Sequence, residues 1–219
     1  MKEKSEDNRR DHRVRVTKML IRRAFTDLLR QKPLQSISVR ELCSKAGINR
    51  STFYAHYSDV YDLLNQIEEE MLAELRVALE PLLRPEAGNP TLAQITNRIF
   101  LCLGQNADFC TAILGDYGDK SFTAKLIQMG RERCAQAYAQ LFPNATAKQI
   151  DFFYTFVSEG CIGLLRRWME EGMVTGAEEL ATMAENIMVY GMGWLRRQKP
   201  AVNREDEIIV PFASAAHRD

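Results

Sequence analysis

The sequence of 219 residues lacks any apolar run near the roughly 18 to 20 residues that a membrane-spanning helix needs. Its charged start, MKEKSEDNRRDHRVR, contains no apolar segment of the type found in secretory signals. The composition, 46% hydrophobic and 26% charged, is that of an ordinary globular protein. Together these features argue against a membrane-spanning protein, and we expect a cytoplasmic protein without membrane partners.

Paired cysteines and clustered histidines are also missing. The five cysteines are scattered singly without a CxxC pair, and the three histidines lie far apart in the sequence. Structural zinc sites and disulfide frameworks require closer spacing, so we expect no metal site and reduced, buried thiols. The cysteines are Cys43, Cys102, Cys110, Cys134 and Cys161.

The sequence likewise contains no glycine-rich loop for phosphate and no convincing Cys–His pair. Asp116, Asp119 and Glu159 could form paired carboxylates, but nothing in their spacing favours this arrangement. A helical enzyme is therefore the least favoured interpretation, and we expect neither catalysis nor a cofactor.

What the chain does contain is an uneven charge distribution behind a net charge of zero. Residues 1–57 carry 14 lysines and arginines against 6 aspartates and glutamates, whereas residues 58–219 carry 15 against 23. The basic quarter can neutralise phosphate groups, while the acidic remainder would be repelled by them. This asymmetry favours a nucleic-acid partner for the N-terminal part if a folded motif is found there.

Helical periodicity runs through nearly the whole chain, and no long segment alternates as a strand does. The first helix is expected from Arg13 until just before Pro33, with an apolar face made of Val16, Met19, Leu20, Ala24, Leu28 and Leu29. Further helices are expected over 38–45, 50–56, 59–79, 91–106, 108–116, 121–141, 146–171 and 177–197. The predicted fold is all-α, with a three-helix head, a connecting helix and a larger helical body.

The boundaries of the short helices are indicated by capping residues. Ser38 and Glu41 have the spacing of a capping box at the start of one helix. Gly47 can end that helix in the left-handed conformation. Ser58 is the expected cap of the connecting helix, which Pro81 closes.

The stretch CSKAGINRSTFYAHY, residues 43–57, has the features of a helix-turn-helix. Gly47 tolerates the positive φ that such a turn requires. Cys43 and Ala46 are small enough to let two helices cross closely, and Ile48 can plug the turn into the core. The pattern predicts two short helices that meet at a steep angle.

Four polar residues, Asn49, Arg50, Ser51 and Thr52, stand where a recognition helix would meet the edges of the bases. An arginine can pair bidentately with guanine, and serine or threonine can bond to bases or phosphates. The alternative is a helical hairpin that binds nothing, because an Ala-Gly turn also occurs there. The pattern together with the charge favours DNA binding.

Residues 38–57, SVRELCSKAGINRSTFYAHY, followed by SDVYDLL, resemble the DNA-binding head of the TetR family of bacterial transcriptional regulators. That family shows a basic first helix, a serine- or threonine-capped helix, an A-G-[VI] turn and a recognition helix ending in [FL]-Y-x-[HY]-[FY]. The resemblance covers roughly residues 13–65. In the body, GCIGLLRRWMEEG at 160–172, with its W-x-x-x-G ending, and the Glu178-Glu179-Leu180 start of the next helix are similar to one C-terminal group of the family.

The resemblance implies a role for each matching residue of the head. Phe53 and Tyr57 would hold the recognition helix to the core, while Tyr54 and His56 would reach DNA. The first helix would contact phosphate and the second would anchor to the DNA backbone. The implied DNA-binding residues are Thr17, Lys18, Ser38, Arg40, Asn49, Arg50, Ser51, Thr52, Tyr54 and His56.

One position departs from the family pattern. The family usually has a lysine where this chain has Val60, so a common phosphate contact is missing. Binding could then depend more on Tyr54, His56 or a basic arm that includes Arg9, Arg10, Arg13 and Arg15. The alternative for these arginines is a solvated, disordered tail.

The resemblance also implies a homodimer built by the last two helices. The expected interface residues are Phe156, Leu164, Trp168, Ile187, Gly191 and Trp194. Two copies of a short recognition helix on symmetric half-sites read more bases than one copy can. The alternative is that both helices are ordinary core of a monomer.

The middle helices are expected to enclose a pocket for a small-molecule effector of unknown identity. Its candidate wall residues are Cys102, Gln105, Asn106, Phe109, Cys110, Phe122, Leu126, Met129, Tyr138 and Tyr154. An aromatic and methionine stripe is more often plain core, so a helix-turn-helix dimer without an effector stays an alternative.

The sequence therefore predicts a sequence-specific DNA-binding transcriptional regulator. By resemblance it would be a homodimeric repressor on a palindromic operator, released by a small molecule. The expected parts are a flexible arm over 1–12, a DNA-binding domain over 13–64, a ligand-binding and dimerisation domain over 65–200 and a tail over 201–219.

Overall fold

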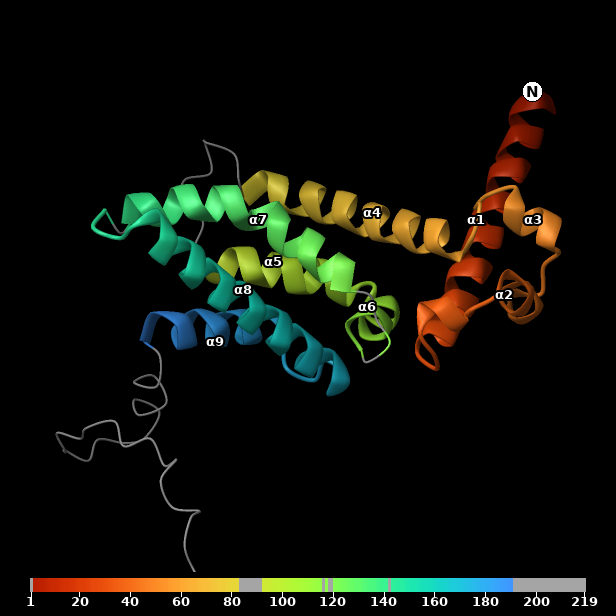
Figure 1. Ribbon diagram of the computed structural model, residues 1–219. Coiled ribbons are helices and arrows are strands. Elements are labelled where there is room, and N and C mark those ends of the chain that lie inside the picture. The colour runs from red at the N-terminus through yellow and green to blue at the C-terminus, as the bar shows by residue number, and fades with distance from the viewer. Residues whose placement is uncertain (1, 83–91, 116, 118–119, 142, 191–219) are drawn as a thin grey trace, which may run out of the picture. The chain divides into compact units, whose positions relative to one another are not determined.

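The computed structural model describes residues 2–82, 92–115, 117, 120–141 and 143–190. These residues form α-helices and two short 3-10 helices without a strand, which confirms the all-α prediction (Figure 1). The α-helices are α1 (Lys2–Leu29), α2 (Val39–Ala46), α3 (Arg50–Tyr54), α4 (Val60–Leu79), α5 (Leu92–Gly104), α6 (Ala107–Leu114), α7 (Lys120–Leu141), α8 (Ala147–Glu170) and α9 (Ala177–Tyr190). The 3-10 helices are Leu34–Ser36 and Glu80–Leu82.

Helix α1 begins at Lys2, whereas the sequence analysis placed its start at Arg13 and expected a flexible arm over 1–12. No glycine or proline precedes Pro33, so nothing in the sequence breaks the helix before that point. The helix start was predicted too late because residues 1–12 are polar. A helix that is not packed against a core needs no apolar face, so polar residues can extend it.

The buried face of α1 is also rotated from the predicted one. Val16, Met19 and Leu20 are exposed, with Met19 at 60%, while Ile21 and Phe25 are fully buried. Ile21 and Phe25, four residues apart, continue the line that Leu28 and Leu29 form, and Val16, Met19 and Leu20 lie on the opposite side of the helix.

The capping residues position the head helices largely as predicted. The Ser38 Oγ accepts a hydrogen bond from the backbone N–H of Glu41, and α2 ends at Gly47 with φ at +68°. The cap of α4 is Asp59 instead of Ser58: the Asp59 Oδ1 accepts bonds from the backbone N–H groups of Tyr61 and Asp62, both at 2.8 Å. An aspartate satisfies two free N–H groups of the first turn at once, which places the helix start one residue later.

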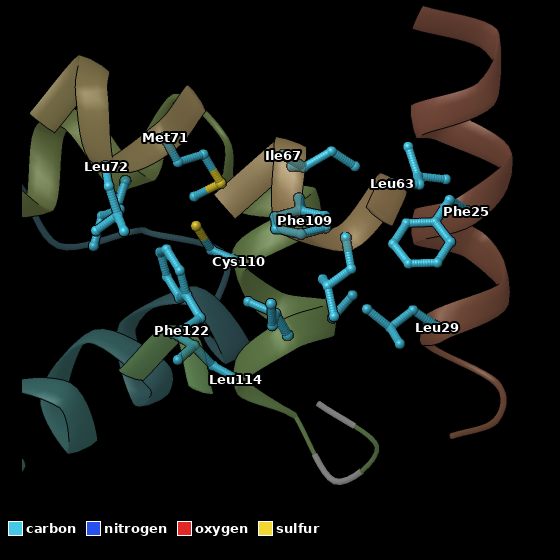
Figure 2. Packing of buried hydrophobic residues seen from close by; sticks show 14 of the residues in the cluster. Phe25, Leu29, Leu63, Ile67, Met71, Leu72, Phe109, Cys110, Leu114 and Phe122 are labelled. Atoms are coloured by element: carbon cyan, nitrogen blue, oxygen red, sulfur yellow. The ribbon is translucent and has the colours of Figure 1, made fainter. Parts of the chain in front are cut away.

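The core joins helices that are distant in the sequence. Figure 2 shows Phe25 and Leu29 of α1 beside Leu63 of α4, in the part of α4 that completes the head. Further along α4, Met71 lies near Cys110 of α6. In the body α4 packs against α5, and α7 packs against α8.

Trp168 explains the W-x-x-x-G ending of α8. Its ring stacks on Phe100 of α5, with centroids 5.9 Å apart, and its Nε1–H donates to the Thr175 carbonyl at 2.7 Å. Four residues later Gly172 turns the chain with φ at +74°. Trp168 is only 7% exposed within its own chain, so most of its surface is already covered, and its place in a dimer interface stays a prediction.

The described residues up to Glu185 form one compact unit, and the described residues 186–190 fall outside it. Helix α4 runs through the predicted domain boundary at 64–65, which stays a prediction. Among the described helices, none is both long and apolar enough to cross a membrane.

Candidate nucleic-acid interface

The turn between α2 and α3 has the close geometry that the sequence predicted. Cys43 and Ala46 are buried on α2, where α3 and α1 pack against it. The backbone N–H of Ile48 donates to the Cys43 carbonyl at 3.0 Å, and the Ile48 side chain packs against the core. The turn therefore fixes the direction in which α3 leaves.

The N-terminal end of α3 carries the polar side chains to the surface. Asn49 occupies the cap position with an extended backbone and without a side-chain capping bond. Asn49, Arg50 and Ser51 are exposed, and Thr52 is half-buried. Since the cap does not use the Asn49 amide, four neighbouring side chains stay available for hydrogen bonds to an outside partner.

The aromatic residues of α3 divide between two sides. Phe53 is fully buried and Tyr57 is 5% exposed, whereas Tyr54 is 56% exposed and His56 is half-buried. The Phe53 and Tyr57 rings lie 5.6 Å apart, and burial raises the pKa of the Tyr57 hydroxyl. Phe53 and Tyr57 thus attach α3 to the head, which leaves Tyr54 on the outer side.

The remaining predicted contacts lie on α1 and α2. Lys18 is half-buried with its Nζ 6.0 Å from the centre of the Tyr57 ring, and Thr17 is also half-buried. Arg40 is exposed. Ser38 is exposed, but its oxygen already accepts the Glu41 N–H, so its hydroxyl proton is what it can offer to a phosphate.

The structure gives a reason for valine at position 60. Val60 is 6% exposed and belongs to the hydrophobic core. Beside it, Asp62 accepts a bond from the Ser58 N–H at 2.8 Å, and this bond lowers the pKa of the Asp62 carboxyl. This end of α4 therefore carries the Asp59 and Asp62 carboxylates instead of a cation.

A hollow lies in the head between the end of α1 and α2, and nothing in the sequence predicted it. It has a volume of about 470 Å³. Its lining residues are Leu28, Gln31, Ser38, Arg40, Glu41, Ser44 and Lys45. Only a folded structure brings these two segments together, so no pattern in the sequence could have revealed it.

The predicted pocket residues have mixed positions. Cys102, Phe109, Cys110, Phe122, Leu126 and Tyr154 are buried, and Met129 and Tyr138 are half-buried. Burial raises the pKa of the Cys110 thiol to about 12, which keeps it protonated at neutral pH. The Tyr154 hydroxyl donates to the Ile127 carbonyl at 2.6 Å, so its polar end is already bonded.

Two of the predicted pocket residues have other surroundings. Gln105 is exposed. Asn106 takes part in a polar link: its Oδ1 accepts from Arg22 at 2.9 Å, and its Nδ2 donates to Glu74 at 3.3 Å. Arg22 belongs to α1, Glu74 to α4, and Asn106 caps α6, so this link joins three helices. The pocket itself stays a prediction.

The residues predicted for a dimer interface are only partly described. Phe156 is 77% exposed on α8, Leu164 is half-buried and Ile187 is exposed. Gly191 and Trp194 lie outside the described residues. Phe152 is 64% exposed one turn before Phe156.

Charged contacts between helices were also missed. The Arg30 Nη2 donates to the Asp108 carboxylate at 2.7 Å, and Lys125 of α7 contacts Glu68 of α4 at 2.9 Å. Such pairs join positions that are distant in the sequence. In the described part of the chain, no cluster of three or more His, Cys, Asp or Glu residues could hold a metal ion.

Residues 91–190 match the sequence profile of a transcriptional regulator C-terminal region. A stretch of 60 residues is 37% identical to the HTH-type dhaKLM operon transcriptional activator DhaS of Lactococcus lactis, covering 27% of this chain and 32% of that protein. A stretch of 146 residues is 27% identical to an uncharacterized HTH-type transcriptional regulator of Haemophilus influenzae, covering 66% of this chain and 62% of the relative. The matches thus span less than two thirds of the length of these curated relatives.

The fold has a solved counterpart in a TetR transcriptional regulator from Streptococcus agalactiae. The two structures superpose with a TM-score of 0.54 at 21% identity, over 82% of this chain and 97% of the other. At this identity the likeness shows a shared fold.

Proposed function

We propose that the chain is a transcriptional regulator of the TetR family and that it binds double-stranded DNA as a homodimer through α3. The observation that carries this proposal is that one side of α3 is buried while its polar side chains are exposed. Phe53 is fully buried, while Arg50, Ser51 and Tyr54 are exposed beside it. A short helix whose polar N-terminal end is held outward in this way fits a major groove.

The proposed contacts follow from exposure and chemistry. Arg50 and Asn49 can read base edges, because arginine pairs with guanine and asparagine with adenine. Lys18 and Arg40 can neutralise phosphates, and Ser38, Thr17 and Thr52 can donate hydroxyl protons. Tyr54 and His56 complete the set on the outer side. No cation stands at position 60, so we propose that these residues carry the phosphate contacts.

The proposed dimer uses α8. Phe152 and Phe156 are exposed one turn apart, and Gly160 follows at the next turn. A Cβ added at Gly160 or Gly163 would meet nothing within 4 Å in its own chain, so neither glycine is required by packing inside the protomer. Aromatic side chains next to bare backbone suit the close approach of a second helix.

We further propose a cytoplasmic repressor with a DNA-binding domain over 13–64 and a regulatory domain over 65–200. An effector that binds one arrangement of the body more tightly would shift the dimer away from DNA. A dimer without an effector is the second candidate. It is favoured by Gln105 being exposed and by Asn106 and Tyr154 already having hydrogen-bond partners inside the protein.

The test is a selection of bound fragments from random double-stranded DNA, repeated with candidate small molecules. A palindromic site with half-sites about one or two helical turns apart is the expected result. Arg50→Ala should relax the base preference within each half-site, whereas Lys18→Ala should weaken all sequences alike. Equal recovery of all fragments by the folded protein would contradict sequence-specific binding.

A further inference from the structure

Glu68 is a carboxylate in an unusual place. It lies on α4, and its side chain is only 2% exposed. A charged group removed from water in this way requires a partner of opposite charge or hydrogen bonds to persist. Its neighbours on α4, Leu64 and Ile67, are buried apolar residues of the core.

Lys125 of α7 supplies the opposite charge and also bonds to two neighbours of Glu68. Its Nζ lies 2.9 Å from the Glu68 Oε2, 2.9 Å from the Asn65 Oδ1 and 3.5 Å from the Glu69 Oε1. Residues 65, 68 and 69 share one face of α4 because they are three and four positions apart. Ser121, one turn earlier on α7, donates its hydroxyl to the Glu68 Oε1 at 3.5 Å.

These contacts hold α4 directly after it leaves the head. Leu63 precedes Asn65 by two residues and lies beside Phe25 and Leu29 of α1 (Figure 2). Any turn or slide of α4 against α7 would separate the Lys125 ammonium from at least one of its three acceptors. Such a movement would also leave the Glu68 carboxylate buried without this ammonium, so intermediate positions are unfavourable.

The opposite face of α4 is linked to other helices. The Glu70 Oε2 lies 3.8 Å from the Arg22 Nη1 of α1, and Glu74 accepts a bond from Asn106, the cap residue of α6. Residues 70 and 74 are one turn apart and point away from the face that Lys125 contacts. Helix α4 is thus held from α7 on one side and from α1 and α6 on the other.

We propose that Lys125 is a positioning residue for DNA binding, which holds α4 against α7 in the orientation that lets the head engage DNA. The proposal rests on the proposed function, because its readout is affinity for the selected operator. Lys125 acts through α4 and touches no DNA. Its bond to Glu68 raises the pKa of the Lys125 ammonium.

The experiment compares Lys125→Met with the double variant Glu68→Leu/Lys125→Met. The full-length protein and the selected operator are used, with affinity measured by fluorescence anisotropy and stability by urea unfolding. Lys125→Met keeps the apolar stem but leaves Glu68 without the ammonium, so we expect a loss of stability and an operator affinity lowered at least about tenfold. The double variant removes both charges, so stability should return while affinity stays low.

The salt dependence of binding separates this role from a direct DNA contact. Lys125 neutralises no phosphate, so the slope of log affinity against log salt should equal that of the wild type in both variants. Arg131→Met is the matched control on α7. It removes the ion pair with Asp151 and the contact with the Tyr154 ring, both of which lie on α8, and should change affinity less than twofold.

Two results would overturn the proposal. One is wild-type affinity in folded Lys125→Met, and the other is recovery of affinity together with stability in the double variant, which would make the pair merely structural. If Lys125→Met does not fold, the double variant alone decides, because it removes the buried Glu68 carboxylate together with the Lys125 ammonium. A wild-type protein that selects no operator would contradict the proposed function instead.

Discussion

Gly47 ends α2 with φ at +68°, a backbone conformation that a residue with a Cβ adopts only with strain. A Cβ added there would meet nothing within 4 Å, so the cost of a side chain is conformational and not steric. We expect Gly47→Ala to lower the free energy of unfolding by about 1 to 2 kcal/mol. Urea unfolding at a fixed protein concentration measures this loss. Gly47→Asn is the control, because asparagine tolerates the left-handed region and should lose less.

Phe53 and Tyr54 are neighbours in the sequence with opposite surroundings. Phe53 is fully buried and Tyr54 is 56% exposed. Phe53→Ala should cost about 3 to 5 kcal/mol of stability through the cavity it leaves. Tyr54→Ala should stay within about 0.5 kcal/mol of the wild type but bind the operator more weakly. Chemical unfolding and operator titration of both variants would show this separation, and equal losses of stability would contradict it.

How far the sequence predicts such residues depends on the range of the interactions involved. Gly47 ends α2, Ser38 caps it and Phe53 lies in the core. Each acts within one or two helical turns, and these local roles were predicted correctly. Nothing in the sequence predicted the contacts of Lys125 with Glu68 and of Asn106 with Arg22, because these partners lie 57 and 84 residues away. Residue spacing carries no information about which distant helices pack together.

At the scale of elements, helices were easier to predict than their faces. Every predicted helix that lies in the described residues is present. The rotation of α1 was wrong because apolar residues occur on both of its sides, and burial of Ile21 and Phe25 leaves Met19 in solvent. The sequence did not reveal that Trp168 stacks on Phe100, because spacing along α8 carries no information about which ring of α5 lies beside it.

The start of α4 gives a prediction for an element. The Asp59 carboxylate accepts two backbone N–H groups of the first turn, so Asp59→Ala leaves both without this partner. We expect a loss of about 1 kcal/mol, since α4 completes the head core. Asp59→Asn is the matched control, because asparagine caps helices nearly as well. A loss of stability that is equal in both variants, measured by urea unfolding, would point to charge instead of capping.

At the scale of the whole molecule, charge and apolar surface are separated along the chain. The net charge of residues 1–57 is positive, and the net charge of residues 58–219 is negative. The exposed aromatic side chains of α8 lie in the acidic part, away in sequence from the proposed DNA contacts. This separation allows one surface to bind a polyanion while another binds a second copy of the chain, without competition between the two.

If Phe156 lies in the dimer interface, disrupting the dimer there should also change how DNA binding depends on salt. An arginine placed at this 77% exposed position should not disturb the protomer, but it would put a charge into the proposed dimer interface. We expect Phe156→Arg to be a folded monomer by light scattering coupled to size-exclusion chromatography. A dimer that neutralises about 8 phosphates should give a slope near −7 of log affinity against log salt, and a monomer about half of that.

Val174→Arg is the control for Phe156→Arg, because Val174 is 88% exposed in the turn between α8 and α9. It adds the same charge to an exposed apolar position outside α8, so the dimer and the salt slope should both persist. A Phe156→Arg protein that stays dimeric would place the interface elsewhere. A monomer that keeps the full slope would show that one head makes all the phosphate contacts, so that pairing two heads adds none to the affinity.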